Sequence, residues 1–290
     1  MPELPEVQTI VDDLNRKIKN RKIVDVWTDA PKIIRGSFPD FKKNIVGRKI
    51  FRVERRAKNI LIYFDSGKLM LTHLKMTGHY LVGRWDLRKE KTKPTPLSDG
   101  WLAEKVNAYV HVVFTLDDDR MLALSDLRKF AKIMFGDADD IFSSAHLKDL
   151  GPEATEISFE DFNRLLENSR KPIKKLLMDQ NLIAGIGNIY SDEILFDAKI
   201  HPLSLAGSLR PEQRKKLYRS MKKILEKALE LRGTSVSDFR DTSGVEGDYG
   251  LRRLVYRREG KPCPGKCPGK VKRIKIGGRS SYFCSDCQKL

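Results

Sequence analysis

The chain has 290 residues, 40% of them hydrophobic, which is enough to build two domains with cores of their own. No apolar run approaches the roughly 20 residues that a membrane span needs, and the opening residues lack the charged and then apolar layout of a signal peptide, so we expect a cytoplasmic protein. Lys and Arg number 56 against 39 Asp and Glu, a net charge of +17, and residues 251–290 alone have 12 basic and two acidic residues. This concentrated positive charge predicts a phosphate backbone as partner, although a ribosome-bound or membrane-surface protein would have a similar balance.

The first six residues read Met-Pro-Glu-Leu-Pro-Glu. Removal of Met1 would expose the secondary amine of Pro2, and because an α-amino group titrates near about 8, part of it is nucleophilic at neutral pH and able to form an imine with a carbonyl-like carbon. Glu3 is placed to move protons, and Glu6, one turn further on, to hold the pair in position. The same residues could instead only begin a helix, because proline favours the first turn and carboxylates favour its positive end.

Next along the chain, apolar residues recur at helical spacing over residues 4–19, which predicts an amphipathic helix. Strand-like runs follow at residues 22–28, 49–55, 59–64, 68–76, 108–116, 121–125 and 129–135. The charged, turn-prone residues 84–107 predict a mobile surface insertion of unknown function. Residues 138–153 change in composition and suit a linker between two domains.

Helical periods return at residues 159–168, 173–180, 189–198 and 211–231. Residues 180–193 (QNLIAGIGNIYSDE) form a glycine-containing turn between two of these helices, and the amides that begin the second helix can bind a phosphate, although a generic helix hairpin would look similar. Residues 233–250 form a long Gly- and Ser-rich loop, which is typical of a lid and equally of a disordered segment.

The only cysteines are two close pairs separated by 16 residues: Cys263, Cys267, Cys284 and Cys287. This spacing predicts a four-thiolate zinc site, and the alternative, two disulfides, is disfavoured in a cytoplasmic protein. The hairpin expected at residues 271–283 is too small to fold unaided, so we expect one structural Zn²⁺ to stabilise it.

Five stretches, in chain order, resemble motifs of the formamidopyrimidine-DNA glycosylases, members of the helix-two-turn-helix glycosylase superfamily. They are the opening MPELPEV, HLKMTG at residues 73–78, DLRKFA at residues 126–131, the turn at residues 180–193 and GGRSSYFC at residues 277–284. The resemblance implies an α+β fold. Its parts are a catalytic domain of an N-terminal helix plus a β-sandwich (2–137), a linker (138–153), a helix-two-turn-helix domain with a lesion-capping loop (154–250) and a zinc finger with a zinc-binding β-hairpin (251–290).

The resemblance also assigns catalytic roles. Pro2 is the implied nucleophile, which attacks C1′ of a flipped damaged nucleotide, while Glu3 helps to open the sugar and Glu6 supports them. Lys58, at the end of a predicted strand, contacts the lesion and its phosphate, and Arg279 grips phosphates beside the lesion. Without the resemblance, a lysine at a strand end would be interpreted as a solvated side chain.

The HLKMTG stretch corresponds to HLGMSG in the family. By this match His73 is a DNA contact and Met76 fills the space that an extruded nucleotide leaves. Alternation along the predicted strand places His73 and Lys75 on one face and Leu74 and Met76 on the other. Met76 could otherwise be an ordinary core residue. Lys75 replaces the family's glycine.

The DLRKFA stretch corresponds to the family's DPRRFG intercalation loop. An enzyme that acts on a base inside a duplex must unstack it, and inserted side chains offset that cost of roughly a few kcal/mol. Arg128 would occupy the gap and read the partner base, Phe130 would wedge the neighbouring step, and Lys129 would hold a phosphate. The alternative is a charged connection with Phe130 in the core. Leu127 and Ala131 replace the usual proline and glycine.

Three further DNA-binding candidates follow from the match. Asn188, in the glycine-containing turn, is a phosphate ligand, and Arg170, just ahead of the preceding helix, is a second candidate for that role. His111 stands where many family members have His-x-His. The first cysteine pair encloses three residues here, where the family usually has two.

The function that the resemblance implies is base-excision repair in the bacterial cytoplasm by a monomer. The enzyme would excise 8-oxoguanine and formamidopyrimidines from damaged double-stranded DNA through a Schiff base on Pro2, and then cut the strand by β,δ-elimination. An endonuclease VIII-like enzyme for oxidised pyrimidines would share Pro2 and Glu3, but residues 73–76 and 128–130 favour the purine branch. The third alternative is a catalytically silent DNA-binding zinc protein, which the intact Pro2, Glu3 and Lys58 disfavour.

Overall fold

The computed structural model of the chain describes residues 1–65, 67–88, 93–235, 239–265 and 267–290. These residues form two compact units, each built from two stretches of the chain. The first unit contains Met1–Lys148 and Leu231–Gly250, and the second contains Asp149–Glu230 and Leu251–Leu290.

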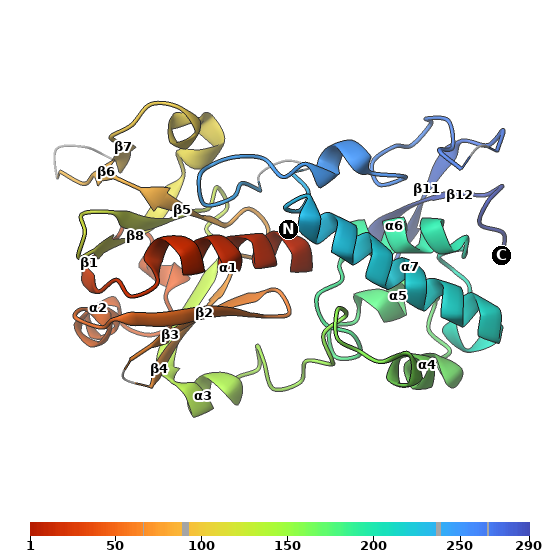
Figure 1. The fold of residues 1–290 in the computed structure, drawn as a ribbon, viewed down its shortest axis with the longest axis horizontal. Helices are drawn as coiled ribbons and strands as arrows, with labels where there is room; N and C mark the ends of the chain where they lie inside the picture. The colour runs from red at the N-terminus through yellow and green to blue at the C-terminus, as the bar shows by residue number, and fades with distance from the viewer. Residues whose placement is uncertain (66, 89–92, 236–238, 266) are drawn as a thin grey trace. The chain divides into compact units, whose positions relative to one another are not determined.

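The first unit begins with helix α1 (Leu4–Ile18), which confirms the predicted amphipathic helix. Val7, Ile10, Leu14 and Ile18 are fully buried along one face. They join the side chains of both sheets in one core, because a helix with a single apolar stripe must bury it against another layer. Figure 1 shows α1 beside strand β2, against which it packs.

Two four-stranded antiparallel sheets form the β-sandwich of this unit. In one sheet the order is β1 (Ile23–Thr28), β8 (Val110–Leu116), β9 (Met121–Ser125) and β5 (His79–Gly83). In the other sheet the order is β10 (Lys132–Asp137), β4 (Lys68–His73), β3 (Asn59–Phe64) and β2 (Ile50–Arg56). Strand β5 was not predicted, and β4 and β10 are shorter than the apolar runs that predicted them.

The remaining elements of the first unit are short. They are η1 (Pro31–Ile33), α2 (Phe38–Ile45), β6 (Trp85–Asp86), β7 (Thr95–Pro96), η2 (Trp101–Ala103), η3 (Lys105–Asn107) and α3 (Ala138–Phe142). The insertion predicted at residues 84–107 is not wholly a surface feature, because Trp85 and Asn107 are buried. Its residues 89–92 lie outside the described part of the chain.

The second unit contains the predicted helices and the hairpin. Its elements are α4 (Phe159–Glu167), α5 (Ile173–Met178), α6 (Asn188–Ala198), η4 (Ala206–Ser208), α7 (Pro211–Glu230), β11 (Val271–Ile276) and β12 (Arg279–Cys284). Helix α6 packs against α7 and β12, and η5 (Tyr249–Arg252) spans the point where the chain enters this unit for the second time. Across the described residues, no helix combines the length and the apolar character needed to cross a membrane.

The division into units differs from the predicted domain boundaries. Residues 231–250 pack with the first unit because Thr234 donates its N–H to Glu6 of α1 (2.6 Å) and Val82 of β5 donates its N–H to Thr242 (2.8 Å). Helix α3, inside the predicted linker 138–153, also belongs to the first unit, where it packs on β10 and β4. The linker prediction is therefore too long at its start, and the helical domain predicted at 154–250 ends earlier.

The zinc-finger segment packs with the helices. The buried carboxylate of Glu193 on α6 accepts the backbone N–H groups of Leu254, Val255 and Tyr256 at 2.6, 2.9 and 2.9 Å. A carboxylate that accepts several amides holds a segment without regular secondary structure in place. This contact fixes the start of residues 251–290 on the second unit.

Candidate active site

The N-terminus of α1 places two buried acids beside Pro2. Glu3 is 2% exposed and Glu6 is 1% exposed, and Pro2 is buried as well. One oxygen of the Glu6 carboxylate, Oε2, accepts the N–H of Glu3 at 2.7 Å, and the other, Oε1, accepts the N–H of Thr234 at 2.6 Å. Glu6 therefore fixes the backbone next to Pro2 and ties it to the 231–250 segment.

Gly233 lies tightly against Glu6. Its φ is +78°, and a Cβ added there would come within 2.7 Å of Glu6 Oε1. Only glycine fits this backbone conformation and this close approach together. The sequence marked residues 233–250 as glycine-rich, but it did not reveal this contact with α1.

Lys58 and His73 lie at one end of the second sheet. The β3–β4 register places Asn59 opposite His73, and Lys58 directly precedes Asn59 in a turn where Ala57 has a φ of +53°. Lys58 is only 6% exposed, so the interpretation of it as a solvated strand-end lysine is wrong. Its ammonium is close enough to His73 to lower the pKa of that ring.

His73 is held as a neutral hydrogen-bond donor. Its Nδ1 lies 3.0 Å from the N–H of Lys75 and accepts it, so the proton of the neutral ring is on Nε2. Burial, and then the positive charges of Lys75, His146 and Lys58, lower the pKa of His73 to about 3. The ring therefore presents an N–H donor at neutral pH amid positive side chains.

Residues 74–76 form a turn, so the alternation predicted for a strand over residues 68–76 is wrong there. Strand β4 ends at His73, and Lys75 adopts a left-handed φ of +56°. Leu74 points into the core at 1% exposure while Met76 is 36% exposed. Glycine adopts a left-handed backbone more readily than lysine does, so the Lys75 backbone is under some strain. Met76 is thus available for contact with a ligand.

A buried carboxylate builds the loop after β9. Asp126 is fully buried, and its Oδ2 accepts the N–H of Ala131 at 2.8 Å. Its Oδ1 accepts the hydroxyl of Thr77 and the N–H of Arg128, the latter at 3.3 Å. Lys129 has a φ of +54°, which completes the turn. Asp126 therefore gives a fixed base to a loop that lacks the family's proline and glycine.

The tip of this loop projects outward. Arg128, Lys129 and Phe130 are all exposed, Phe130 at 46%, so the core alternative for Phe130 is wrong. The guanidinium carbon of Arg128 lies 4.4 Å from the centre of the Phe130 ring. This stacked pair is a planar, positively charged group of the kind that can enter a gap between bases.

In the second unit, the turn between α5 and α6 is organised by Gln180. Its Oε1 accepts the N–H of Gly185 at 3.0 Å and its Nε2 donates to Ile186 O at 2.7 Å, which supports the φ of +101° at Gly185. Asn188 follows at the first turn of α6, and its Oδ1 is enclosed without a hydrogen-bond donor among the described residues. Asn188 thus lies at the positive end of α6, which suits an anion.

Arg279 begins β12 and lines a cavity of about 410 Å³ in the second unit. Lys174 and Lys175 of α5 line the same cavity, together with Gly277 of the hairpin turn. Lys174 is paired with the buried Asp192 at 2.6 Å, and Asp179 also lines the cavity. Arg279 and Lys175 are therefore the basic groups there that suit an anion such as a phosphate. Arg170 is exposed just before α5.

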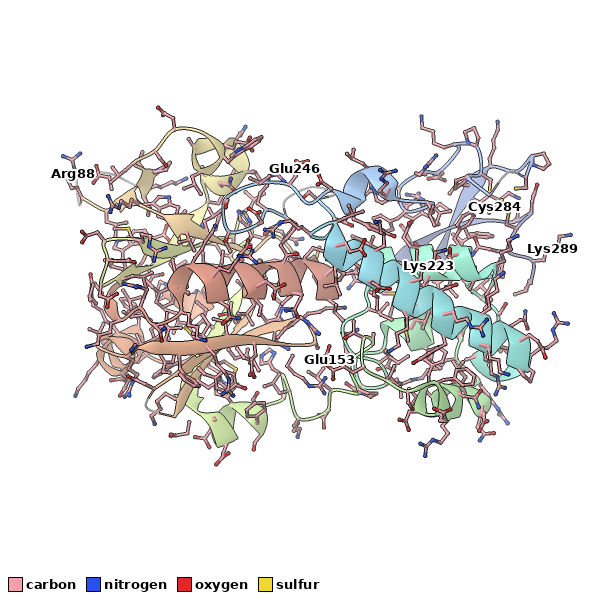
Figure 2. The ribbon with its side chains drawn as sticks, in the orientation of Figure 1. Arg88, Glu153, Lys223, Glu246, Cys284 and Lys289 are labelled. Atoms are coloured by element: carbon pink, nitrogen blue, oxygen red, sulfur yellow. The ribbon has the colours of Figure 1, made fainter. Side chains whose placement is uncertain are left out.

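The four cysteines converge at the hairpin. Cys284, labelled in Figure 2, ends β12, and the four Sγ atoms lie within 4.8 Å of one another. Sγ separations of 3.7 Å (Cys263–Cys287), 3.5 Å (Cys267–Cys284) and 3.4 Å (Cys267–Cys287) are too long for disulfides, so the disulfide alternative is wrong. They are close to the roughly 3.8 Å edge of a tetrahedron with metal–sulfur bonds near 2.3 Å. The cluster can therefore hold one metal ion. Lys266, within the first pair, lies outside the described residues.

Comparison with known proteins decides the family. Residues 1–133 match the model of the formamidopyrimidine-DNA glycosylase N-terminal domain, and residues 150–240 match the model of the formamidopyrimidine-DNA glycosylase H2TH domain. The chain belongs to the formamidopyrimidine-DNA glycosylase family. A protein of that name from Pelotomaculum thermopropionicum is 39% identical over 100% of both chains.

Solved structures of the family agree with this assignment. The Lactococcus lactis glycosylase in complex with abasic-site DNA superposes with a TM-score of 0.86 and 31% identity, covering 99% of this chain and 100% of that one. The same enzyme with Fapy-dG DNA gives a TM-score of 0.85 and 30% identity over 99% of this chain and 100% of that one. As a formamidopyrimidine-DNA glycosylase, the protein is a DNA glycosylase with AP lyase activity that acts on oxidised purines in base-excision repair.

One sequence-based candidate has a structural role in this glycosylase. His111 is 5% exposed on β8, and its Nδ1 lies 2.8 Å from Oδ1 of Asp29, while Thr28 donates its hydroxyl to the His111 carbonyl at 2.7 Å. These contacts hold the β1 side of the first sheet. The structure therefore gives no support for His111 as a DNA contact.

The structure adds residues to the site that the motifs did not single out. Asp126 and Thr77 shape the loop that presents Arg128, and Thr234 completes the Glu6 contact. His146 lies 6.3 Å from His73 between ring centres, and no motif contains it. Position alone hinted at Asp126 and Thr77, because they lie within the DLRKFA and HLKMTG stretches.

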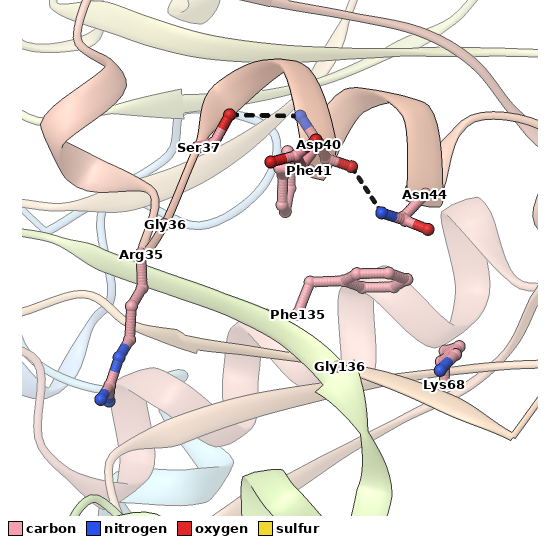
Figure 3. Close-up of a pocket in the computed structure, with 9 residues that line it drawn as sticks. All are labelled: Arg35, Gly36, Ser37, Asp40, Phe41, Asn44, Lys68, Phe135 and Gly136. Atoms are coloured by element: carbon pink, nitrogen blue, oxygen red, sulfur yellow. Dashed lines mark hydrogen bonds between the residues drawn. The ribbon is translucent and has the colours of Figure 1, made fainter.

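A cavity away from these groups lies between α2 and β10 (Figure 3). Its volume is about 290 Å³, and Arg35, Ser37, Asn44 and Phe135 are among the residues that line it. None of the described residues that line it is a predicted site residue. The cavity is therefore separate from the candidate chemistry.

The neutral His73 should make the fold less stable in acid. Its pKa is about 3 in the folded chain against 6.5 for an unperturbed ring, so below pH 6.5 the unfolded chain binds the proton first, and stability present at neutral pH is lost towards pH 3. Replacing the ring by His73→Asn should reduce the loss of unfolding free energy between pH 6 and pH 4.5 by about 2 kcal/mol. Urea denaturation at the two pH values measures this, and equal losses in both proteins would show that the ring is not held neutral.

Proposed function

We propose that this glycosylase flips oxidised purines out of double-stranded DNA and removes them through a Schiff base between Pro2 and the sugar. The observation that carries the proposal is the pair of buried acids at Pro2, in which the Glu6 carboxylate holds the Glu3 N–H at 2.7 Å. A nucleophile needs a proton-transfer group beside it and a fixed position, and this arrangement provides both.

The reaction starts once Met1 has been removed. The Pro2 nitrogen attacks C1′ and loses its N–H proton, the glycosidic bond breaks, and the purine leaves with the bonding electrons and takes up a proton from water. Glu3 delivers a proton to the ring oxygen, so that the sugar opens to an iminium ion linking C1′ to Pro2. Loss of a C2′ proton then expels the 3′ phosphate, and a second elimination expels the 5′ phosphate. Water releases Pro2 from the remaining sugar fragment.

Lys58 and His73 bind the phosphate next to the lesion. The Lys58 ammonium supplies charge, and the neutral His73 supplies an Nε2–H donor that stays in the same protonation state throughout the physiological pH range. The exposed Met76 fills the space of the flipped nucleotide. Arg128 faces the unpaired base, with Phe130 as the wedge and Lys129 on a phosphate.

The second unit supplies separate phosphate contacts. Asn188 at the N-terminus of α6, the exposed Arg170 and Arg279 on the hairpin meet the DNA backbone. The four cysteines hold one structural Zn²⁺, which stabilises the hairpin and hence the position of Arg279. We propose that the protein acts as a monomer on damaged duplex DNA, and that residues 233–250 form a capping loop over the everted base. Residues 236–238 of this loop lie outside the described residues.

Substrate preference separates this proposal from an endonuclease VIII-like activity. Single-turnover cleavage should be compared on matched duplexes with 8-oxoguanine opposite cytosine and with thymine glycol opposite adenine. We expect the 8-oxoguanine duplex to be cut faster, because the Arg128 and Met76 loops follow the purine-branch motifs. Faster cleavage of the thymine glycol duplex would overturn the assignment.

A further inference from the structure

The described end of the insertion contacts the capping loop directly. We call residues 101–107, which form η2 and η3, the brace. Asn107 of the brace is 1% exposed, although it lies in a charged segment that the sequence suggested was a surface feature. A buried amide side chain needs partners for both its donor and its acceptor.

Asn107 finds these partners on three different segments. Its Nδ2 donates to Trp101 O at 2.6 Å within the brace and to Gly244 O at 3.4 Å in the capping loop. Its Oδ1 lies 2.9 Å from Nε2 of the fully buried His79 on β5. Because Nδ2 faces two carbonyl oxygens, Oδ1 is the atom at His79, and the histidine proton is on Nε2.

Gly244 fits the brace without room for a side chain. Its φ is +88°, and an added Cβ would lie 2.7 Å from Nδ2 of Asn107 and 3.1 Å from the carbonyl of Trp101. The Gly244 backbone therefore packs closely on the Trp101 carbonyl, and the side-chain amide of Asn107 donates to the carbonyl oxygens of both residues.

Other contacts hold the same arm of the loop. The Arg240 guanidinium lies 2.7 Å from Glu246, labelled in Figure 2, and 4.0 Å from Glu104 of the brace. On the opposite side, Lys17 of α1 donates to the hydroxyls of Thr242 (2.8 Å) and Ser243 (2.7 Å). Residues 239–250 are thus held between α1 and the brace.

This arm is also linked to the arm that reaches the nucleophile. Ser235 donates its hydroxyl to Phe239 O at 2.8 Å, and its oxygen accepts the N–H of Gly247 at 2.9 Å. The neighbouring Thr234 donates its N–H to Glu6, which holds Glu3. Ser235 therefore joins the two arms of the loop, while the separate bond from Thr234 to Glu6 holds the end of the loop that lies at α1.

We propose that the brace positions the capping loop for base capture, with Asn107 as the positioning residue. This inference rests on the proposed function, because it assigns the insertion a role in holding the everted base. Asn107 touches no reacting atom and acts through Gly244. Its loss should therefore affect removal of a base and spare cleavage at a site that has already lost its base, where the loop has nothing to hold.

The sharpest test is Gly244→Ala, with Gly47→Ala, in the turn after α2, as its matched control. Both glycines have a positive φ, +88° and +86°, which disfavours alanine, but a Cβ at Gly47 meets nothing within 4 Å. Gly244→Ala should slow 8-oxoguanine release about tenfold, as expected for one lost hydrogen bond. Cleavage of a duplex with a preformed abasic site should stay at the parent rate, and Gly47→Ala should change neither rate.

Asn107→Asp provides a second variant, in which the new side chain has the same size as the asparagine that it replaces. Its carboxylate still accepts from His79 but has no N–H for the carbonyls of Trp101 and Gly244, so the same split between the two substrates is expected. Amide hydrogen exchange of the 239–250 peptide should become faster in both variants. Parent-like 8-oxoguanine release in both variants, or an equal fall in both reactions, would overturn the inference. A parent chain that cleaves neither duplex would refute the proposed function and the inference with it.

Discussion

Glu3→Gln should slow excision of 8-oxoguanine by about two to four orders of magnitude, the usual contribution of a positioned proton-transfer group. Glutamine has nearly the same shape, so the start of α1 should remain intact, but an amide cannot deliver a proton to the opening sugar. Glu3 is 2% exposed, which leaves little water beside it to take over this role. Single-turnover kinetics with enzyme in excess measure the excised base directly.

The control for this experiment is Asp12→Asn, which removes a carboxylate from the exposed face of the same helix. We expect this variant to excise at the parent rate. Binding of both variants to the lesion duplex should stay within a fewfold of the parent, because neither residue is proposed to hold DNA. An unchanged excision rate in Glu3→Gln would exclude Glu3 from the chemistry.

Cys284→Ser should remove the bound zinc and weaken DNA binding by about 10- to 100-fold. The Cys284 side chain is fully buried in the cluster, and loss of one thiolate breaks a four-ligand site. Arg279 lies on the same hairpin, five residues earlier in β12, so its phosphate contact, worth roughly 1.5–3 kcal/mol for a charge-assisted hydrogen bond, is lost as the hairpin unfolds.

Zinc content by atomic absorption and affinity by fluorescence anisotropy test this prediction together. Ser285→Ala, next to the ligand but outside the cluster, should retain one zinc ion and the parent affinity. A Cys284→Ser protein that binds lesion DNA as tightly as the parent would show that the hairpin does not depend on the metal.

Local patterns were sufficient for the elements with strong periodicity. Helix α1 and strand β3 lie where the apolar spacing predicted them, and the cysteine spacing anticipated the cluster that the structure forms. These features are readable because each depends on residues close together in the chain. The motifs then indicated a family, and the resemblance implied roles for single residues that spacing alone could not assign.

Short elements and turns were harder to predict. Helix α2 buries only Phe41 and Ile45 within eight residues, which is too few for a periodic signal. Strand β4 ends before the apolar run does, because Lys75 adopts a left-handed conformation. Strand β10 begins at Lys132 because the buried Asp126 holds the preceding residues in a loop.

Contacts between distant parts of the chain were not readable at all. The hydrogen bond between Glu6 and Thr234 joins residues 228 positions apart, and the one between Asn107 and Gly244 joins residues 137 positions apart. Composition marked one of these segments as a surface insertion and the other as a lid or a disordered loop. Only the fold shows that both help to position the loop beside the nucleophile.

The central claim is that a freed Pro2 amine bonds to the sugar, and borohydride trapping tests it most directly. Protein without Met1 and protein that retains it should each be incubated with 8-oxoguanine DNA and borohydride, and the products weighed by mass spectrometry. We expect an adduct on Pro2 in the processed protein only, because Met1 makes the Pro2 nitrogen an amide. Equal adduct in the Met1-retaining protein would contradict the account, and tight binding without any adduct would favour a catalytically silent DNA-binding protein.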